Sequence, residues 1–186
     1  GSSGYGSGAA HGGNGAAAAL NNISQENTAI YDTGFRPTKL GSGGALAAGG
    51  TGGGAVIINA SSAVILNGTI SANGGAGGYK AGGGSGGTVS IDTVSISGSG
   101  SISALGGNGA GNSGSGGGGG MVSIYYSDSY SLATNSLTVT GGTGYSGRTG
   151  DSGTVIIFND QTKDLKVEKD LILYKDEGVD SSAQLT

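Results

Sequence analysis

The sequence predicts an all-β protein, a parallel β-helix or similar solenoid in which repeats of about 33 residues stack on one another. Two observations lead to this prediction: short aliphatic segments return at a constant spacing, and long glycine-rich tracts separate them. Gly accounts for 45 of the 186 residues, and Pro occurs once. Because each Gly in a helix costs about 1 kcal/mol relative to Ala, this composition disfavours α-helices. The absence of a Gly-X-Y period also excludes collagen.

Four tetrapeptides mark the repeat. Their first residues lie 33 positions apart, and glycine precedes each of them. The second and fourth residues of each tetrapeptide are aliphatic, which is the alternation expected of a strand with one buried face. The four are Ala55-Val56-Ile57-Ile58, Thr88-Val89-Ser90-Ile91, Met121-Val122-Ser123-Ile124 and Thr154-Val155-Ile156-Ile157.

A second apolar stretch follows the tetrapeptide in each of the first three units. Residues 67–75 and 99–107 are the most similar pair, and their offset is 32, so we expect a one-residue adjustment between the strands of a unit. A single unit cannot bury its aliphatic face, whereas units stacked in parallel can. The apolar residues are Val64, Leu66 and Ile70, then Val94, Ile96 and Ile102, then Leu132, Leu137 and Val139.

Each unit ends in a glycine-rich tract. The tracts at 71–87 and 104–120 both contain 17 residues, and the third, at 141–153, is shorter. Equal length in two different sequences indicates a geometric requirement. Residues 74–87 also show a three-residue rhythm, which suits extended helices of the polyproline II shape that pack side by side as in polyglycine II. Irregular ordered loops and mobile loops are the two alternatives.

The composition divides the chain into three parts. Residues 1–54 are interpreted as a degraded glycine-rich repeat or cap, in which residues 20–40 cover one end of the stack. Residues 55–157 form the predicted solenoid core, with repeats starting near 55, 88, 121 and 154. Residues 158–186 are strongly charged, and a strand over 166–174 either caps the stack or pairs with the next subunit.

The residue inventory does not favour catalysis. Polysaccharide-cleaving β-helices need clustered carboxylates, but the acids outside the C-terminal part lie at unrelated repeat positions. Matches to glycine-rich phosphate-binding motifs are expected by chance in so glycine-rich a chain, so they do not indicate a phosphate site. His11, the single histidine, is interpreted as part of a glycine tract and not as a ligand. We therefore expect no enzyme activity, no cofactor and no metal; the acids in question are Glu26, Asp32, Asp92, Asp128 and Asp151.

Three tyrosines are candidate contacts with a ligand or a neighbouring subunit: Tyr79, Tyr125 and Tyr130. Alternation along the strand predicts that Tyr126 points inward and Tyr125 outward, where it is able to stack on a sugar or on another subunit. The simpler interpretation is an aromatic residue that covers the core at a strand end. Three Asn-X-Ser/Thr sequons, at Asn22, Asn59 and Asn67, are candidate N-glycosylation sites.

Charge and hydropathy exclude two classes of partner. A net charge of −4 argues against nucleic-acid binding, which needs a basic surface. No run of about 20 apolar residues is present, so membrane insertion is not expected. Ice-binding solenoids usually carry regular Thr-X-Thr ladders, and the single such triplet, Thr138-Val139-Thr140, makes that function less favoured.

Residues 34–126 resemble the glycine-rich repeat module of very large secreted surface and filament proteins of protists, algae and bacteria. The stretch 31–44 resembles the lead-in of that module, and the charged C-terminal part departs from it. The similarity lies in Gly82-Gly83-Gly84-Ser85-Gly86-Gly87-Thr88-Val89-Ser90-Ile91, in residues 97–109, and in the glycines at 116–120 followed by Met121-Val122-Ser123-Ile124-Tyr125-Tyr126.

This resemblance implies an extracellular coat, filament or adhesin part and no enzymatic activity. We therefore expect a structural component of an extracellular filament, appendage or surface layer. It would assemble with itself, with sister subunits or within a larger chain, through strand edges and glycine tracts. The alternative is an adhesin or glycan-binding module that presents its glycine and tyrosine face; an ice-binding solenoid is less favoured. The expected location is the cell surface or the extracellular space.

Overall fold

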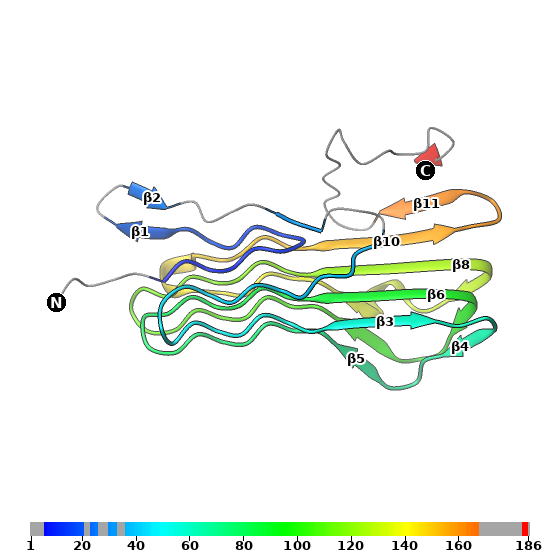
Figure 1. Ribbon diagram of the computed structural model, residues 1–186, viewed down its shortest axis with the longest axis horizontal. Helices are drawn as coiled ribbons and strands as arrows, with labels where there is room; N and C mark the ends of the chain where they lie inside the picture. The colour runs from blue at the N-terminus through cyan, green and yellow to red at the C-terminus, as the bar shows by residue number, and fades with distance from the viewer. Residues whose placement is uncertain (1–5, 21–22, 26–29, 33–35, 168–183, 186) are drawn as a thin grey trace.

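The computed structural model describes residues 6–20, 23–25, 30–32, 36–167 and 184–185. Stacked strands form one end of the molecule, and wavy extended segments form the other (Figure 1). Regular structure in the described residues consists of strands and two short 3-10 turns, at Thr134–Ser136 and Tyr145–Gly147. The fold is a β-solenoid, as the sequence predicts.

The first strands of the four rungs form one parallel array. These strands are β3 (Ala55–Asn59), β6 (Thr88–Ser97), β8 (Met121–Ser131) and β10 (Thr154–Asn159). Ala55 pairs with Thr88, Thr88 with Met121, and Met121 with Thr154, so the register equals the 33-residue period. The periodicity of the sequence is therefore the pairing register of the sheet.

A smaller parallel sheet faces this array. It contains β5 (Thr69–Ser71), β7 (Ser101–Ser103) and β9 (Leu137–Thr138), while β4 (Ala63–Ile65) pairs with the second half of β6. The offset between rungs falls from 33 at Asn59 and Asp92 to 32 at Ala63 and Ser95. This change is the expected one-residue adjustment between the strands of a unit.

The hydrophobic core lies between the two sheets. Alternate residues of the first strands point into it, and the second apolar stretches close it from the other side. The first rung is only partly covered, since its core-facing aliphatic side chains remain half-buried, whereas the core-facing aliphatic side chains of the next rungs are buried. The core residues include Val89, Ile91, Ile96, Ile102, Val122, Ile124, Leu132, Leu137, Val139, Val155 and Ile157.

The two ends of the large sheet differ. After β10 the chain turns back, and β11 (Asp164–Val167) pairs antiparallel with it; β12 (Gln184–Leu185) then pairs with β11. Most of the expected strand over 166–174 lies outside the described residues. At the other end, no strand of the described residues pairs with the outer edge of β3.

The N-terminal part lies beside the stack. β1 (Ala18–Leu20) and β2 (Ile23–Gln25) form an antiparallel hairpin. Residues 36–40 cross the outer face of the large sheet, where the Lys39 carbonyl accepts a 2.9 Å hydrogen bond from Thr88 Oγ1. Residues 36–40 therefore lie against a face of the large sheet.

Candidate functional site

The glycine tracts form ordered helices of the polyglycine II type. Along the segment 82–87, successive backbone N–H groups donate to three neighbouring segments in turn. The N–H groups of residues 82 and 85 donate to the carbonyls of Ala45 and Ser42 in one neighbouring segment. Those of residues 83 and 86 donate to the carbonyls of Ser115 and Gly118 in a second segment. Those of residues 84 and 87 donate to the carbonyls of Gly75 and Ala72 in a third segment. A period of three residues per turn produces this pattern.

The carbonyl groups of the same segment accept from the remaining sides. Gly50 and Gly53 donate to the carbonyls of Gly82 and Ser85, and Ala9 donates to Gly83. The donors and acceptors of this segment thus bond to neighbouring segments on all of its sides. This is the hydrogen-bonding pattern of hexagonal packing. Because every backbone group finds a partner in another segment, a chain that is poor in apolar side chains can still be ordered.

Ten extended segments build this bundle in three layers, as the hydrogen bonds define them. The central layer contains the four segments that return to the strands, and the two outer layers contain three each. A hairpin joins each outgoing segment to its returning partner. The central layer is 49–54, 81–87, 114–120 and 148–153; one outer layer is 72–78, 104–109 and 139–144; the other is 41–45, 6–11 and 13–17.

The close approach of these segments explains the glycine content. A methyl group on Gly117 would overlap the carbonyl group of Gly84, and one on Gly86 would overlap the carbonyl of Ala104. Both obstacles are backbone atoms, which cannot rotate away. At such positions only glycine fits the spacing of the segments.

In the outer layer that contains 72–78, asparagine side chains accept hydrogen bonds from backbone N–H groups of the next segment. Asn73 Oδ1 accepts from the N–H of Leu105, and Asn108 Oδ1 accepts from the N–H of Thr143, both at 2.8 Å. Asn73, Leu105, Asn108 and Thr140 line an open groove. Its walls are small and uncharged, so the groove by itself does not indicate a reactive site.

The hairpin turns lie at the end of the glycine bundle that is farthest from the stacked strands (Figure 1), and they carry large exposed side chains. We call this surface the tip surface. It comprises residues 45–48, 78–81, 109–115 and 143–149. Tyr79 is 74% exposed, Tyr145 47% and Leu46 46%. Lys80 and Arg148 are its charged residues, and these four ranges contain no Asp or Glu.

Each turn of the tip surface places a residue in the left-handed region of backbone conformation. The φ angles are 75° at Leu46, 62° at Lys80, 66° at Gly111 and 54° at Ser146. This region costs an ordinary L-residue roughly 1–2 kcal/mol, and glycine avoids the cost. Three of the four turns nevertheless carry a side chain there, although glycine is the commonest residue in this chain.

Tyr125 lies on the outer face of the sheet, as alternation predicts, but the structure covers it. Tyr125 as a whole is 5% exposed. The Arg36 guanidinium lies 4.1 Å from the ring centroid, and the Phe158 ring lies 5.6 Å away. Burial raises the pKa of the Tyr125 hydroxyl, although Arg36 opposes the shift. A sugar could reach this ring only after Arg36, which is also paired with Asp92, moves aside.

The other predicted contact residues are spread over the molecule. Tyr130 is half-buried, packs against the core and lies 5.7 Å from the Tyr126 ring. Tyr79 belongs to the tip surface, far along the chain from both. Asn59 and Asn67 are exposed, and Asn22 lies outside the described residues. The structure therefore does not gather Tyr79, Tyr125 and Tyr130 into one site.

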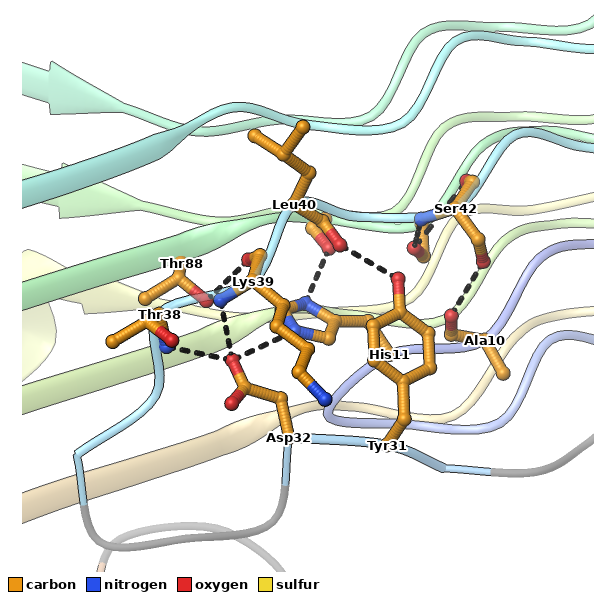
Figure 2. A network of polar contacts seen from close by, with 11 residues as sticks. Ala10, His11, Tyr31, Asp32, Thr38, Lys39, Leu40, Ser42 and Thr88 are labelled. Atoms are coloured by element: carbon orange, nitrogen blue, oxygen red, sulfur yellow. Dashed lines mark hydrogen bonds and ion pairs between the residues drawn. The ribbon is translucent and has the colours of Figure 1, made fainter.

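A buried polar network that the sequence did not indicate surrounds His11 (Figure 2). His11 is fully buried; its Nδ1 donates to the Gly86 carbonyl at 2.9 Å, and its Nε2 lies 3.6 Å from Asp32 Oδ2. The Tyr31 ring lies 4.7 Å from the imidazole. Asp32 also accepts from the N–H groups of Thr38 and Lys39, at 2.7 and 2.6 Å. This network holds residues 31–32 and 38–42 against the glycine bundle.

The His11 network contains no exposed nucleophile and is interpreted as a structural clamp. No group of three or more His, Cys, Asp or Glu side chains that could hold a metal occurs in the described part of the chain. The same residues contain no helix that is both long and apolar enough to cross a bilayer. No family model, curated protein or solved structure matches the chain.

Proposed function

We propose that this chain is a structural module of an extracellular filament, appendage or surface layer. It associates with a second copy of itself, or with a sister subunit, through the open edge of its first rung. The observation that carries the proposal concerns the glycine that precedes the first strand of every rung.

Gly54, Gly87, Gly120 and Gly153 occupy the same position in the four rungs. A methyl group on any of the last three would overlap the carbonyl oxygen of the equivalent glycine in the rung below. A methyl group on Gly54 would meet no atom within 4 Å. Within the part of the chain that the structure describes, nothing requires a glycine at position 54, whereas a further strand beneath the first rung would leave no room for a side chain there. The glycine therefore supports a partner at this edge.

The backbone of β3 is suited to such a partner. The Gly54 carbonyl accepts from the N–H of Thr88, and the Ala60 N–H donates to the carbonyl of Asp92. The backbone N–H and C=O groups of the even-numbered residues of β3 therefore point toward β6. Alternation then directs the N–H and C=O groups of Ala55, Ile57 and Asn59 toward the open edge. An edge of this kind pairs readily with another strand.

Apolar burial favours the same association. Val56, Ile58 and Ile70 of the first rung are only half-buried, whereas their equivalents Val89, Ile91 and Ile102 are completely buried by the rungs on both sides. A strand paired with β3 would place its own side chains against the uncovered ones. Each side chain that becomes fully buried adds about 1.5–3 kcal/mol at most.

Analytical ultracentrifugation of the full chain tests the proposal. We expect association that increases with concentration. Ile57→Pro removes an N–H that points to the open edge and blocks pairing there, while the internal ladder stays intact. This variant should be monomeric with an unchanged melting temperature, and Ile57→Ala serves as the control that keeps the N–H. A native chain that stays monomeric at its highest soluble concentration contradicts the proposal.

A second candidate function is binding of a glycan, and the tip surface favours it. The most exposed aromatic ring in the described residues, Tyr79, lies there, and aromatic faces stack on sugar rings. Tyr125, the residue that alternation alone suggests for this role, is covered. A glycan array that compares the native chain with Tyr79→Ala and Tyr125→Ala separates the two positions: loss on Tyr79→Ala alone supports the tip surface.

A further inference from the structure

The backbone strain at the free end of the glycine bundle points to side chains that are retained for contact. Lys80 and Ser146 adopt left-handed conformations in a chain where glycine is the commonest residue. Glycine there would remove the strain and would fit the surrounding sequence. Residues held in unfavourable conformations cluster at binding sites, where the surrounding structure keeps them in place.

The two exposed tyrosines of the tip surface lie on the second and the fourth of its four turns, 78–81 and 143–149. Adjacent rungs are separated by about 4.8 Å, so the two turns are roughly 10 Å apart. The turn between them carries small residues, Ala110, Gly111 and Asn112. A Cβ atom on Gly111 would lie 3.1 Å from Tyr79 Cδ2, so the Tyr79 ring rests against this low turn. Tyr79 and Tyr145 thus lie on alternate turns of the tip surface, with a turn of small residues between them.

The two charged residues within the four ranges of the tip surface are both basic. Lys80 Nζ lies 5.4 Å from the Tyr79 ring centroid, and Arg148 Nη1 donates to the Ser113 carbonyl of the middle turn at 3.4 Å. Acidic residues lie instead on the strands, with Asp92 in β6, Asp128 in β8 and Asp164 in β11, and Asp160 lies in the turn after β10. A chain with a net charge of −4 thus places two cations beside its exposed aromatic rings.

We propose that the tip surface binds an acidic polysaccharide. Sugar rings stack on Tyr79 and Tyr145, and carboxylate or sulfate groups on the same chain pair with Lys80 and Arg148. Two cations are too few for the phosphate contacts that support nucleic-acid binding, whereas they fit a charge on alternate sugars. This inference deepens the second candidate function by naming its ligand class, and it does not depend on association through β3.

Binding of the full chain to immobilised polygalacturonate tests the proposal, with neutral dextran and polyglutamate as comparison ligands. The measurements use the Ile57→Pro background, so that association through β3 does not alter the apparent affinity. We expect saturable binding to polygalacturonate that weakens with added salt. Binding to dextran and to polyglutamate should be at least about tenfold weaker, which corresponds to about 1.4 kcal/mol.

Lys80→Gly is the decisive variant, because glycine removes the backbone strain together with the charge. Its melting temperature should rise or stay the same while its affinity for polygalacturonate falls by about tenfold or more. Lys163→Gly is the matched control: Lys163 has the same φ of 62° but lies in the turn between β10 and β11, at the opposite end. It should bind as the native chain does.

Five outcomes contradict the inference. Unchanged affinity in Lys80→Gly, or an equal loss in Lys163→Gly, shows that the tip surface is not the site. Equal binding to dextran would support glycan binding but would show that the acidic groups of the polysaccharide are not recognised. Equal binding to polyglutamate shows that charge alone is recognised. No binding to any of the three ligands removes both the inference and the second candidate function, while association through β3 is judged separately by sedimentation.

Discussion

The imidazole of His11 donates its Nδ1–H to the carbonyl of Gly86 at 2.9 Å and thereby takes the place of a backbone donor. Three residues earlier along the same central segment, the Gly83 carbonyl accepts from the N–H of Ala9 at 3.0 Å. The chain turns at residues 11–13, so no backbone N–H of the segment 6–11 reaches Gly86. The histidine side chain extends the three-residue hydrogen-bond pattern to the end of the bundle.

Loss of this side chain should destabilise the fold. His11→Ala leaves the Gly86 carbonyl without its partner in a fully buried place, and it also removes the contact with Tyr31. We expect the free energy of unfolding to fall by about 1–3 kcal/mol, measured by urea denaturation. His11→Asn keeps a donor and should restore part of the loss. Equal losses in the two variants would show that packing, not the hydrogen bond, is responsible.

Acidification should also destabilise the protein through His11. Burial lowers the pKa of His11 below 6.5, and the Gly86 carbonyl and Asp32 oppose the shift only in part. The unfolded chain therefore binds a proton near pH 6.5 that the folded chain does not yet bind. Stability is complete above this pH and is lost as the pH falls below it.

Melting temperatures between pH 7.5 and 5.5 test this pH dependence. The native chain should lose more stability across this range than His11→Asn, which has no group that titrates at this position. Asp32 and Tyr31 are the titratable side chains that contact the imidazole, and both remain in the control. A native chain that becomes more stable on acidification would show that the pair with Asp32 dominates.

Glycine substitutions should have opposite effects at the centre and at the edge of the stack. Gly117→Ala places a methyl group against the backbone of Gly84 and should destabilise the fold by about 3 kcal/mol or more. Gly54→Ala meets open space and should stabilise the monomer by about 0.4–1 kcal/mol. In the assembly the same methyl group obstructs the partner, so ultracentrifugation of Gly54→Ala should show weaker association. Unchanged association would contradict docking at this edge.

Arg36 should protect Tyr125 from chemical modification. In the native chain, nitration by tetranitromethane should reach the exposed Tyr79 and Tyr145 and spare Tyr125. Arg36→Ala uncovers the ring and should make Tyr125 reactive, with a loss of stability of about 0.5–1 kcal/mol. Mass spectrometry of the nitrated peptides reports each residue separately. Arg36→Lys, which keeps a cation, is the control for charge without the flat guanidinium.

The strands and their register follow from local features of the sequence. Val89 and Ile91 alternate with polar residues, and the same alternation returns 33 residues later, so both the buried face and the pairing are apparent before folding. The three-residue rhythm of 74–87 likewise indicates the shape of the glycine segments. Alternation also places Tyr126 against the core and Tyr125 on the outer face, as the structure has them.

The tertiary structure alone decides what covers these faces. Every hydrogen bond that orders residues 82–87 joins them to another segment, so a glycine tract by itself does not identify its neighbours. Arg36 reaches Tyr125 from 89 positions away, and His11 reaches Gly86 from 75. Such contacts depend on the packing of distant segments and leave no periodic signal.

The sequence by itself determined the repeat, the strands and the need for close backbone packing, because those depend on spacing and side-chain size. The tertiary structure decided the three-layered arrangement of the glycine segments, the open edge at Gly54 and the placement of Tyr79, Lys80 and Tyr145 on the tip surface. These features arise where separate rungs meet or end. Their physical cause is the requirement that each backbone group find a partner in a neighbouring segment.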